Sequence, residues 1–145
     1  MYTASIKTHG DSMARSTTDV RSFKVFADEP PELGGLDGAP SPLEYILVAH
    51  GTCLNYMTFF IARELGIQVN STEIEVEAAL DPARFAGTDR SARAGYQSVK
   101  VNIKVDTDAT PDQLAKLREE VEARCPVSDN ITNATPVSIS FAAAA

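Results

Sequence analysis

The chain has 145 residues, of which 43% are hydrophobic and 23% charged, and a formal net charge of −7 at pH 7. This composition is that of an ordinary globular protein and predicts a single domain over residues 1–145 that folds without a metal or a disulfide. The acidic balance, with a pI near 4.7, argues against nucleic acid as a partner.

The first ten residues contain no apolar core of the length found in signal peptides, and no run of about 18 consecutive apolar residues occurs anywhere. We therefore expect a cytoplasmic protein with no membrane partner. The chain has two cysteines, which are too few for a disulfide scaffold. In a reducing compartment both are expected to be free thiols.

The N-terminal part of the chain favours strands. Runs of β-favouring residues at Tyr2–Lys7 and Val20–Ala27 are separated by Gly10 and by a polar turn at residues 16–19. This pattern predicts a hairpin or a three-stranded meander. Residues 28–41 concentrate Pro, Gly and Asp, and we expect an ordered surface loop there.

A long helix is predicted next. Ser41 is placed as the N-cap, Pro42 occupies the first helical position and Glu44 completes a capping box. Gly66 marks the end of the helix. The apolar residues between these limits surround the helix axis, so the helix should be buried on most sides. One small domain can cover only part of such a helix, which predicts a homodimer.

Two strands of alternating polarity follow, at Glu73–Leu80 and Val99–Val105. Each should have one apolar and one solvated face, and the Lys and Glu side chains of the solvated face are expected either to be hydrated or to pair across the strands. The segment between them, 81–95, is too long for a tight turn and is expected to be a flexible loop.

A second helix is predicted from the N-cap Thr110 to Cys125, where Pro126 stops it. A last strand is expected from the alternating Val137, Ile139 and Phe141. The resulting order of elements, β-β-β-α-β-β-α-β, predicts an α+β fold with antiparallel pairing.

The cysteines are the candidate reactive groups. Cys53 lies in the middle of the first helix, with His50 three positions earlier on the same face and Gly51 between them. A free cysteine is often only a small buried hydrophobe, and a histidine in an apolar helix is more often hydrogen-bonded packing than a catalyst. Cys125 lies at a helix C-terminus, which disfavours a thiolate and suits a resolving role better than that of primary nucleophile.

Other chemistries have little support in the sequence. A zinc site built from Cys53, Cys125, His50 and His9 lacks the close ligand pairs that such sites use. A Ser-His-Asp hydrolase has no nucleophile elbow to support it. We therefore expect no metal and no cofactor.

Three segments resemble the OsmC/Ohr family: DEPPELGG at 28–35, GAPSPLEYILVAHGTC at 38–53 and EARCPVSDNI at 122–131. The resemblance implies an OsmC-like fold with antiparallel sheets around two central helices, in an intertwined homodimer with active sites at the interface. It also implies thiol-dependent reduction of organic or hydrogen peroxide. Cys53 matches the peroxidatic cysteine of that family, and Cys125 matches the resolving one.

The sequence departs from the organic-hydroperoxide branch of that family at two charged positions. An arginine of the first hairpin and a glutamate after the proline that starts the helix hold the thiolate in that branch. Ser12 and Leu43 occupy the corresponding positions here, while Arg15 and Glu44 lie close by and are the candidate replacements. The sequence is thus more similar to the other OsmC-like branches.

Two functions remain open at this point. In the first, the protein is a peroxidase in which Cys53 attacks a hydroperoxide, Cys125 forms a disulfide with it, and an external dithiol restores both thiols. In the second, the protein is a non-catalytic member of the family that binds a small hydrophobic ligand at the dimer interface. The loss of thiols on exposure to peroxide separates the two.

Overall fold

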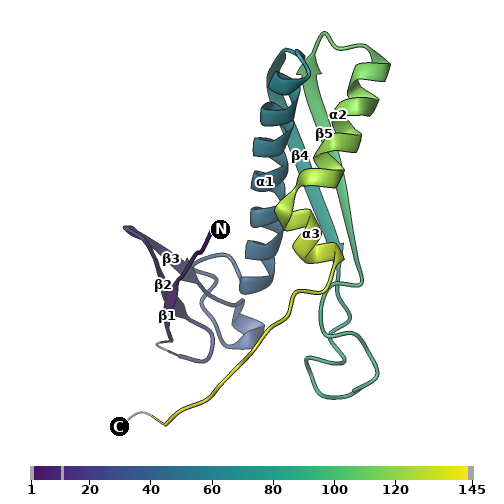
Figure 1. Ribbon diagram of the computed structural model, residues 1–145. Coiled ribbons are helices and arrows are strands. Elements are labelled where there is room, and N and C mark those ends of the chain that lie inside the picture. The colour runs from purple at the N-terminus through teal and green to yellow at the C-terminus, as the bar shows by residue number, and fades with distance from the viewer. Residues whose placement is uncertain (1, 11, 144–145) are drawn as a thin grey trace. The chain divides into compact units, whose positions relative to one another are not determined.

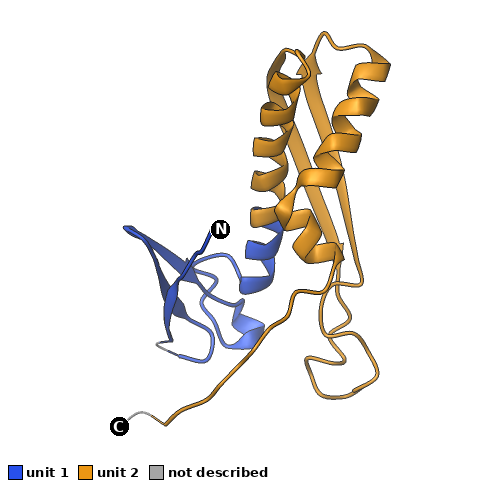
Figure 2. Ribbon diagram, in the orientation of Figure 1, with its two compact units in different colours: residues 1–48 blue, residues 49–145 orange. Residues whose placement is uncertain are grey.

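The computed structural model describes residues 2–10 and 12–143. The chain divides into two compact units, Met1–Val48 and Ala49–Ala145 (Figure 2). The boundary falls within the long helix α1, Pro42–Glu64. The first unit holds a small sheet and a loop, and the second holds a long hairpin and two further helices.

The predicted three-stranded meander is confirmed in the first unit. Its antiparallel strands follow one another in the order of the chain, with the bounds β1 Lys7–Gly10, β2 Ser16–Val20 and β3 Phe23–Ala27. The predicted bounds were wrong in two places: the first strand begins at Lys7, and the polar residues 16–19 form a strand, not a turn.

The reason for the second error lies in the two threonines of β2. Thr17 and Thr18 are β-branched and pair with Phe26 and Val25 of β3, and such cross-strand pairs stabilise a sheet even where the sequence is polar. The turn falls instead at Arg21, which has a φ of 56°.

The loop at residues 28–41 contains a short 3₁₀ helix, η1 Pro31–Leu33. Gly34 follows it with a φ of 85°, which favours glycine. At Gly35 the chain passes so close to itself that a Cβ atom would lie 1.7 Å from the carbonyl oxygen of Glu29. The two glycines therefore allow this loop to close tightly.

Helix α1 begins and ends where the capping signals predict. Ser41 donates its N–H to the carboxylate of Glu44 (2.7 Å), and Glu44 donates its N–H to the Ser41 hydroxyl (3.3 Å), which is the expected capping box. Gly66, beyond the last turn, has a φ of 71°.

The second unit is built around the antiparallel hairpin of β4, Val69–Ala79, and β5, Ser98–Thr107. The predicted alternation is confirmed. Ile74 pairs with Ile103 on the apolar face, whereas on the solvated face Lys104 and Glu73 form an ion pair at 2.5 Å.

Two helices complete the unit: α2, Pro111–Arg124, and α3, Pro126–Thr132. Figure 1 shows α1 and α2 running along the hairpin. The core lies where they meet, and partly buried residues of β4 and β5 cover it. Its buried members are Leu54, Met57, Ile61, Ala62, Ile67, Val69, Leu117, Val121 and Cys125. Burial of each large side chain contributes about 1.5–3 kcal/mol.

The strand predicted at Val137, Ile139 and Phe141 is wrong, since this segment is extended without strand pairing. The three side chains are exposed by 79%, 77% and 97%. Alternating polarity shows which face of a segment could be buried, but a strand forms only against another strand edge. Within residues 2–10 and 12–143, no strand pairs with this segment.

Helix α1 is also long and apolar enough to cross a membrane, with a mean hydropathy of 1.3 over its most apolar window. The core helix of a soluble protein meets the same criterion. One side of α1 packs in the core of the second unit, through Leu54, Met57, Ile61 and Ala62. The expectation that this helix is buried on most sides is wrong for the single chain, because several large apolar side chains of α1 are exposed: Leu43, Ile46, Val48, Tyr56, Phe59 and Phe60.

Candidate active site

The two cysteines lie together in the second unit. Cys53 is in the middle of α1, Cys125 is at the junction of α2 and α3, and their sulfur atoms are 3.5 Å apart although 72 positions separate them in the sequence. Both are free thiols. Cys125 is 1% exposed, whereas Cys53 is half-buried. The pair is therefore placed for disulfide formation, with Cys53 on the more accessible side.

Cys125 is held by both of the helices that it joins. Its backbone N–H closes the last turn of α2 on the carbonyl of Val121 (3.0 Å), and its Sγ accepts the N–H of Ser128 in the first turn of α3 (3.5 Å). Pro126 explains both features, because proline ends one helix and suits the first position of the next. The sequence-based prediction rested only on the first property, and α3 was not predicted.

The expectation that its position disfavours a thiolate on Cys125 is wrong. Burial acts to raise the pKa of Cys125, but hydrogen bonds from the side chain and backbone of Ser128 outweigh burial and hold this pKa below its ordinary value. The donors come from α3, which the sequence analysis did not include.

Cys53 is in the opposite situation. Burial is the largest cause that raises its pKa, and the neighbouring Cys125 raises it further, while the N–H of Val127 acts in the other direction. The two opposite directions favour negative charge on Cys125 over Cys53.

His50 lies one turn before Cys53 and is buried, with its Nε2 atom 2.9 Å from the hydroxyl oxygen of Ser128. The expectation that His50 is hydrogen-bonded packing agrees with this contact. Burial lowers its pKa, so the imidazole is neutral at pH 7. Ser128 itself was missed in the sequence, where a serine after a Cys-Pro pair carries no distinct signal.

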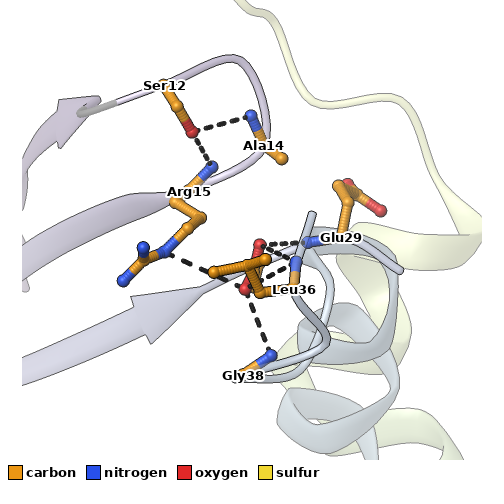
Figure 3. A network of polar contacts seen from close by, with 7 residues as sticks. Ser12, Ala14, Arg15, Glu29, Leu36 and Gly38 are labelled. Atoms are coloured by element: carbon orange, nitrogen blue, oxygen red, sulfur yellow. Dashed lines mark hydrogen bonds and ion pairs between the residues drawn. The ribbon is translucent and has the colours of Figure 1, made fainter. Parts of the chain in front are cut away.

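Arg15, one of the two candidate charged residues, belongs to the first unit and faces the buried carboxylate of Asp28 at 4.0 Å (Figure 3). The same carboxylate accepts the N–H groups of Glu29, Leu36 and Gly38. These hydrogen bonds and the charge of Arg15 overcome the effect of burial and lower the pKa of Asp28. Arg15 thus already has an anionic partner within its own unit.

Glu44, the other candidate, is the capping partner of Ser41. The backbone and side-chain hydrogen bonds from Ser41 lower its pKa and hold it as a carboxylate. Its observed role is to fix the start of α1. Each of the two charged candidates therefore has a partner close to it in the chain, Asp28 for Arg15 and Ser41 for Glu44.

A cavity of about 560 Å³ lies beside the cysteine pair in the second unit. Most of its walls are aliphatic side chains of α1, β5 and α2, and its polar groups include His50 and Ser128. The aliphatic residues that line it are Leu54, Val101, Ile103, Val105, Leu114, Leu117 and Val121. Such a space suits a small apolar molecule or an alkyl chain.

No group of three or more His, Cys, Asp and Glu side chains that could hold a metal ion occurs among residues 2–10 and 12–143. Cys53 and Cys125 lie with their sulfur atoms 3.5 Å apart, and no such group in the described part of the chain includes them.

The site and fold together define an α+β protein with a close pair of thiols between its helices. The chain belongs to the OsmC-like protein family, whose model matches residues 35–140. No curated protein matches the sequence significantly.

Solved structures show the same fold. An OsmC-like protein from Mycoplasma pneumoniae has a TM-score of 0.77 and 14% identity, with 90% of this chain and 88% of that chain covered. The organic hydroperoxide resistance protein OsmC from Legionella pneumophila has a TM-score of 0.65 and 20% identity, with 90% of each chain covered. An organic hydroperoxide resistance protein from Elizabethkingia anophelis has a TM-score of 0.63 and 15% identity, covering 89% and 87%.

Proposed function

We propose that the protein is a thiol-dependent peroxidase that reduces organic or hydrogen peroxide through Cys53 and Cys125. The observation that carries this proposal is the distance of 3.5 Å between the two sulfur atoms. Such proximity is what a dithiol needs in order to trap an oxidised sulfur before it is oxidised further. The hydroperoxide-resistance proteins among the structural neighbours support the same chemistry.

In the first step, the Cys53 thiolate attacks the distal oxygen of a hydroperoxide and the O–O bond breaks. The leaving alkoxide takes a proton and becomes an alcohol, while Cys53 is oxidised to a sulfenic acid. In the second step, the Cys125 thiolate attacks the Cys53 sulfur, the S–S bond forms, and hydroxide leaves and is protonated to water. An external dithiol then supplies two electrons and restores both thiols.

The different solvent exposure of the two cysteines supports Cys53 as the residue that attacks the peroxide and Cys125 as the resolving residue. Cys53 is the more accessible sulfur, whereas Cys125 is almost fully buried behind it and is suited to meet Cys53, not the peroxide. The lowered pKa of Cys125 fits a resolving thiolate, because the second step needs its negative charge. The cavity nearby has mostly aliphatic walls, with Arg118 and Glu122 also in its lining, and offers room for the alkyl group of an organic hydroperoxide.

Treating the reduced protein with one equivalent of cumene hydroperoxide should remove two free thiols from each chain within minutes, because both cysteines enter one disulfide. Free thiols can be counted with a chromogenic disulfide reagent after unfolding. Cys53→Ser is the control and should lose none. Retention of both thiols in the native protein would contradict the peroxidase proposal.

The rate of the first step should rise steadily between pH 6 and 9. The raised pKa of Cys53 keeps its reactive thiolate scarce at neutral pH, and each increase in pH adds thiolate until that pKa is passed. Stopped-flow measurement of peroxide consumption in a single turnover gives the profile. A flat profile would show that a cation already holds Cys53 as a thiolate, and Arg15→Ala would then identify whether Arg15 supplies it.

The protein is further proposed to act as a cytoplasmic homodimer, as its family resemblance and exposed apolar residues suggest. Its remaining partners in this proposal are the hydroperoxide and the reducing dithiol.

One observation favours the second function, a binding protein for a small hydrophobic ligand. The cavity of about 560 Å³ is large enough for such a ligand and has mostly aliphatic walls. Under this alternative both thiols survive cumene hydroperoxide, and an apolar fluorescent probe binds with one site per chain. The thiol count therefore decides between the two functions.

A further inference from the structure

A partly buried hydrogen bond joins α1 to α3 beside the cysteines. It runs between the Nε2 atom of His50 and the hydroxyl of Ser128, which are 2.9 Å apart and separated by 78 positions in the sequence. His50 is only 7% exposed. This contact links a buried histidine to a residue that touches Cys125, and the mechanism above assigns it no role.

The burial of His50 determines the direction of this hydrogen bond. Its Nδ1 atom has no partner among residues 2–10 and 12–143, and the neutral imidazole carries a single N–H. A buried donor without a partner is rarer than a buried acceptor without one. The hydrogen therefore sits on Nε2 and is donated to the oxygen of Ser128, which leaves the hydroxyl hydrogen of Ser128 for another acceptor.

That acceptor is the sulfur of Cys125. The backbone N–H of Ser128 reaches it at 3.5 Å, and the Ser128 side chain is the largest of the causes that lower the pKa of Cys125. We propose that His50 is a positioning residue, which turns the Ser128 hydroxyl toward Cys125 and so holds Cys125 as a thiolate. This inference rests on the proposed function, in which that thiolate attacks oxidised Cys53.

The charged groups near Cys125 do not account for its thiolate. Arg124 precedes it in the chain, but the guanidinium is bound to Glu64 at 2.6 Å and lies 3.6 Å from Glu120. On α1, Cys53 and the neutral His50 face the site. On α2, Arg118 and Glu122 line the adjoining cavity, where Arg118 lies 3.7 Å from Glu122. Hydrogen bonds from α3 are therefore the means by which the site stabilises negative charge on this sulfur.

The consequence for the reaction is that no base has to remove a proton from Cys125 in the second step. The contacts of Ser128 favour the thiolate form of Cys125 when the sulfenic acid forms, and this thiolate attacks the sulfur of Cys53 as hydroxide leaves. The hydroxide takes a proton from solvent to become water. His50 transfers no proton in this scheme, and its effect passes entirely through Ser128.

The test measures the ionisation of Cys125 alone, in a Cys53→Ser background and without peroxide. Thiolate absorbance in the ultraviolet is followed from pH 5 to 10. Adding Ser128→Ala should reduce the fraction of thiolate at pH 7 roughly tenfold, since one hydrogen bond to a charged group is lost. Ser128→Thr keeps the hydroxyl and should restore the parent titration.

His50 is tested in the same background. His50→Leu should reduce the thiolate fraction as Ser128→Ala does, and should have no further effect when Ser128 is already alanine, because His50 acts through that hydroxyl. His50→Gln can still donate a hydrogen bond and should keep most of the thiolate. Circular dichroism confirms folding, and His50→Met replaces His50→Leu if the latter does not fold.

An unchanged titration in folded Ser128→Ala would overturn the proposal. A shift in Ser128→Ala but none in the His50 variants would overturn the positioning role. Because no peroxide is present, these results do not depend on whether the protein is a peroxidase. If cumene hydroperoxide removes no free thiols, the proposed function is contradicted. The titration of Cys125 is a separate result and still tests the role of His50 and Ser128.

Discussion

Replacing Cys53 by serine is expected to abolish peroxide consumption. A serine hydroxyl is a far poorer nucleophile than a thiolate toward the O–O bond, and the loss should be at least about a thousandfold. The buried Cys125 is expected not to substitute for it, since its sulfur is 1% exposed. The measurement is consumption of cumene hydroperoxide in the presence of a dithiol reductant.

Cys125→Ser is the matched variant and should behave differently. It keeps the first turnover and then stops at the sulfenic acid, which a dimedone-type reagent traps and which excess peroxide converts to sulfinic acid. Mass spectrometry after one equivalent of peroxide should show a disulfide in the native protein and an oxygen adduct on Cys53 in Cys125→Ser. An adduct on Cys125 in the Cys53→Ser protein would reverse the roles assigned to the two sulfurs.

Local signals explain why α1 and α2 were predicted well. The capping box of Ser41 and Glu44 and the glycine at 66 act on their own neighbours, and the structure has α1 between them. The box at Thr110 and Gln113 starts α2 in the same way. The alternating polarity of β4 and β5 predicted these strands equally well, because one face of each strand packs on the core.

The cysteine pair shows what the sequence could supply only through resemblance. Nothing local connects Cys53 with Cys125, and the distance of 3.5 Å between their sulfurs results from the packing of α1 against α2. Ser128 was missed for the same reason, since it gains its role from His50 on a distant helix. The helix-terminus argument about Cys125 was wrong because it considered α2 and not the N–H donors of α3.

The exposed apolar residues, including those of the predicted C-terminal strand, bear on the oligomeric state of the protein. The apolar side chains at 137, 139 and 141 are almost fully exposed in the single chain. Exposed apolar residues also occur in both units, among them Phe23, Phe26, Tyr56 and Phe60. Soluble proteins seldom leave so much apolar surface open, and a second copy of the chain is the occupant that we propose.

Light scattering should therefore give about twice the chain mass of 15.6 kDa at micromolar concentration. If the C-terminal segment becomes a strand in the dimer, its apolar face is buried and its other face remains in solvent. Ile139→Asp should then weaken the dimer at least roughly a hundredfold, because a buried charge without a partner costs several kcal/mol.

Ser140→Asp introduces the same charge one residue later, on the opposite face of the expected strand, and should leave the dimer intact. Sedimentation velocity over a range of protein concentrations measures both dissociation constants. Equal weakening by the two variants would show that charge alone matters and that the segment does not pair as a strand. A native protein that is monomeric at micromolar concentration, with unchanged thermal stability on dilution, would remove the dimer proposal altogether.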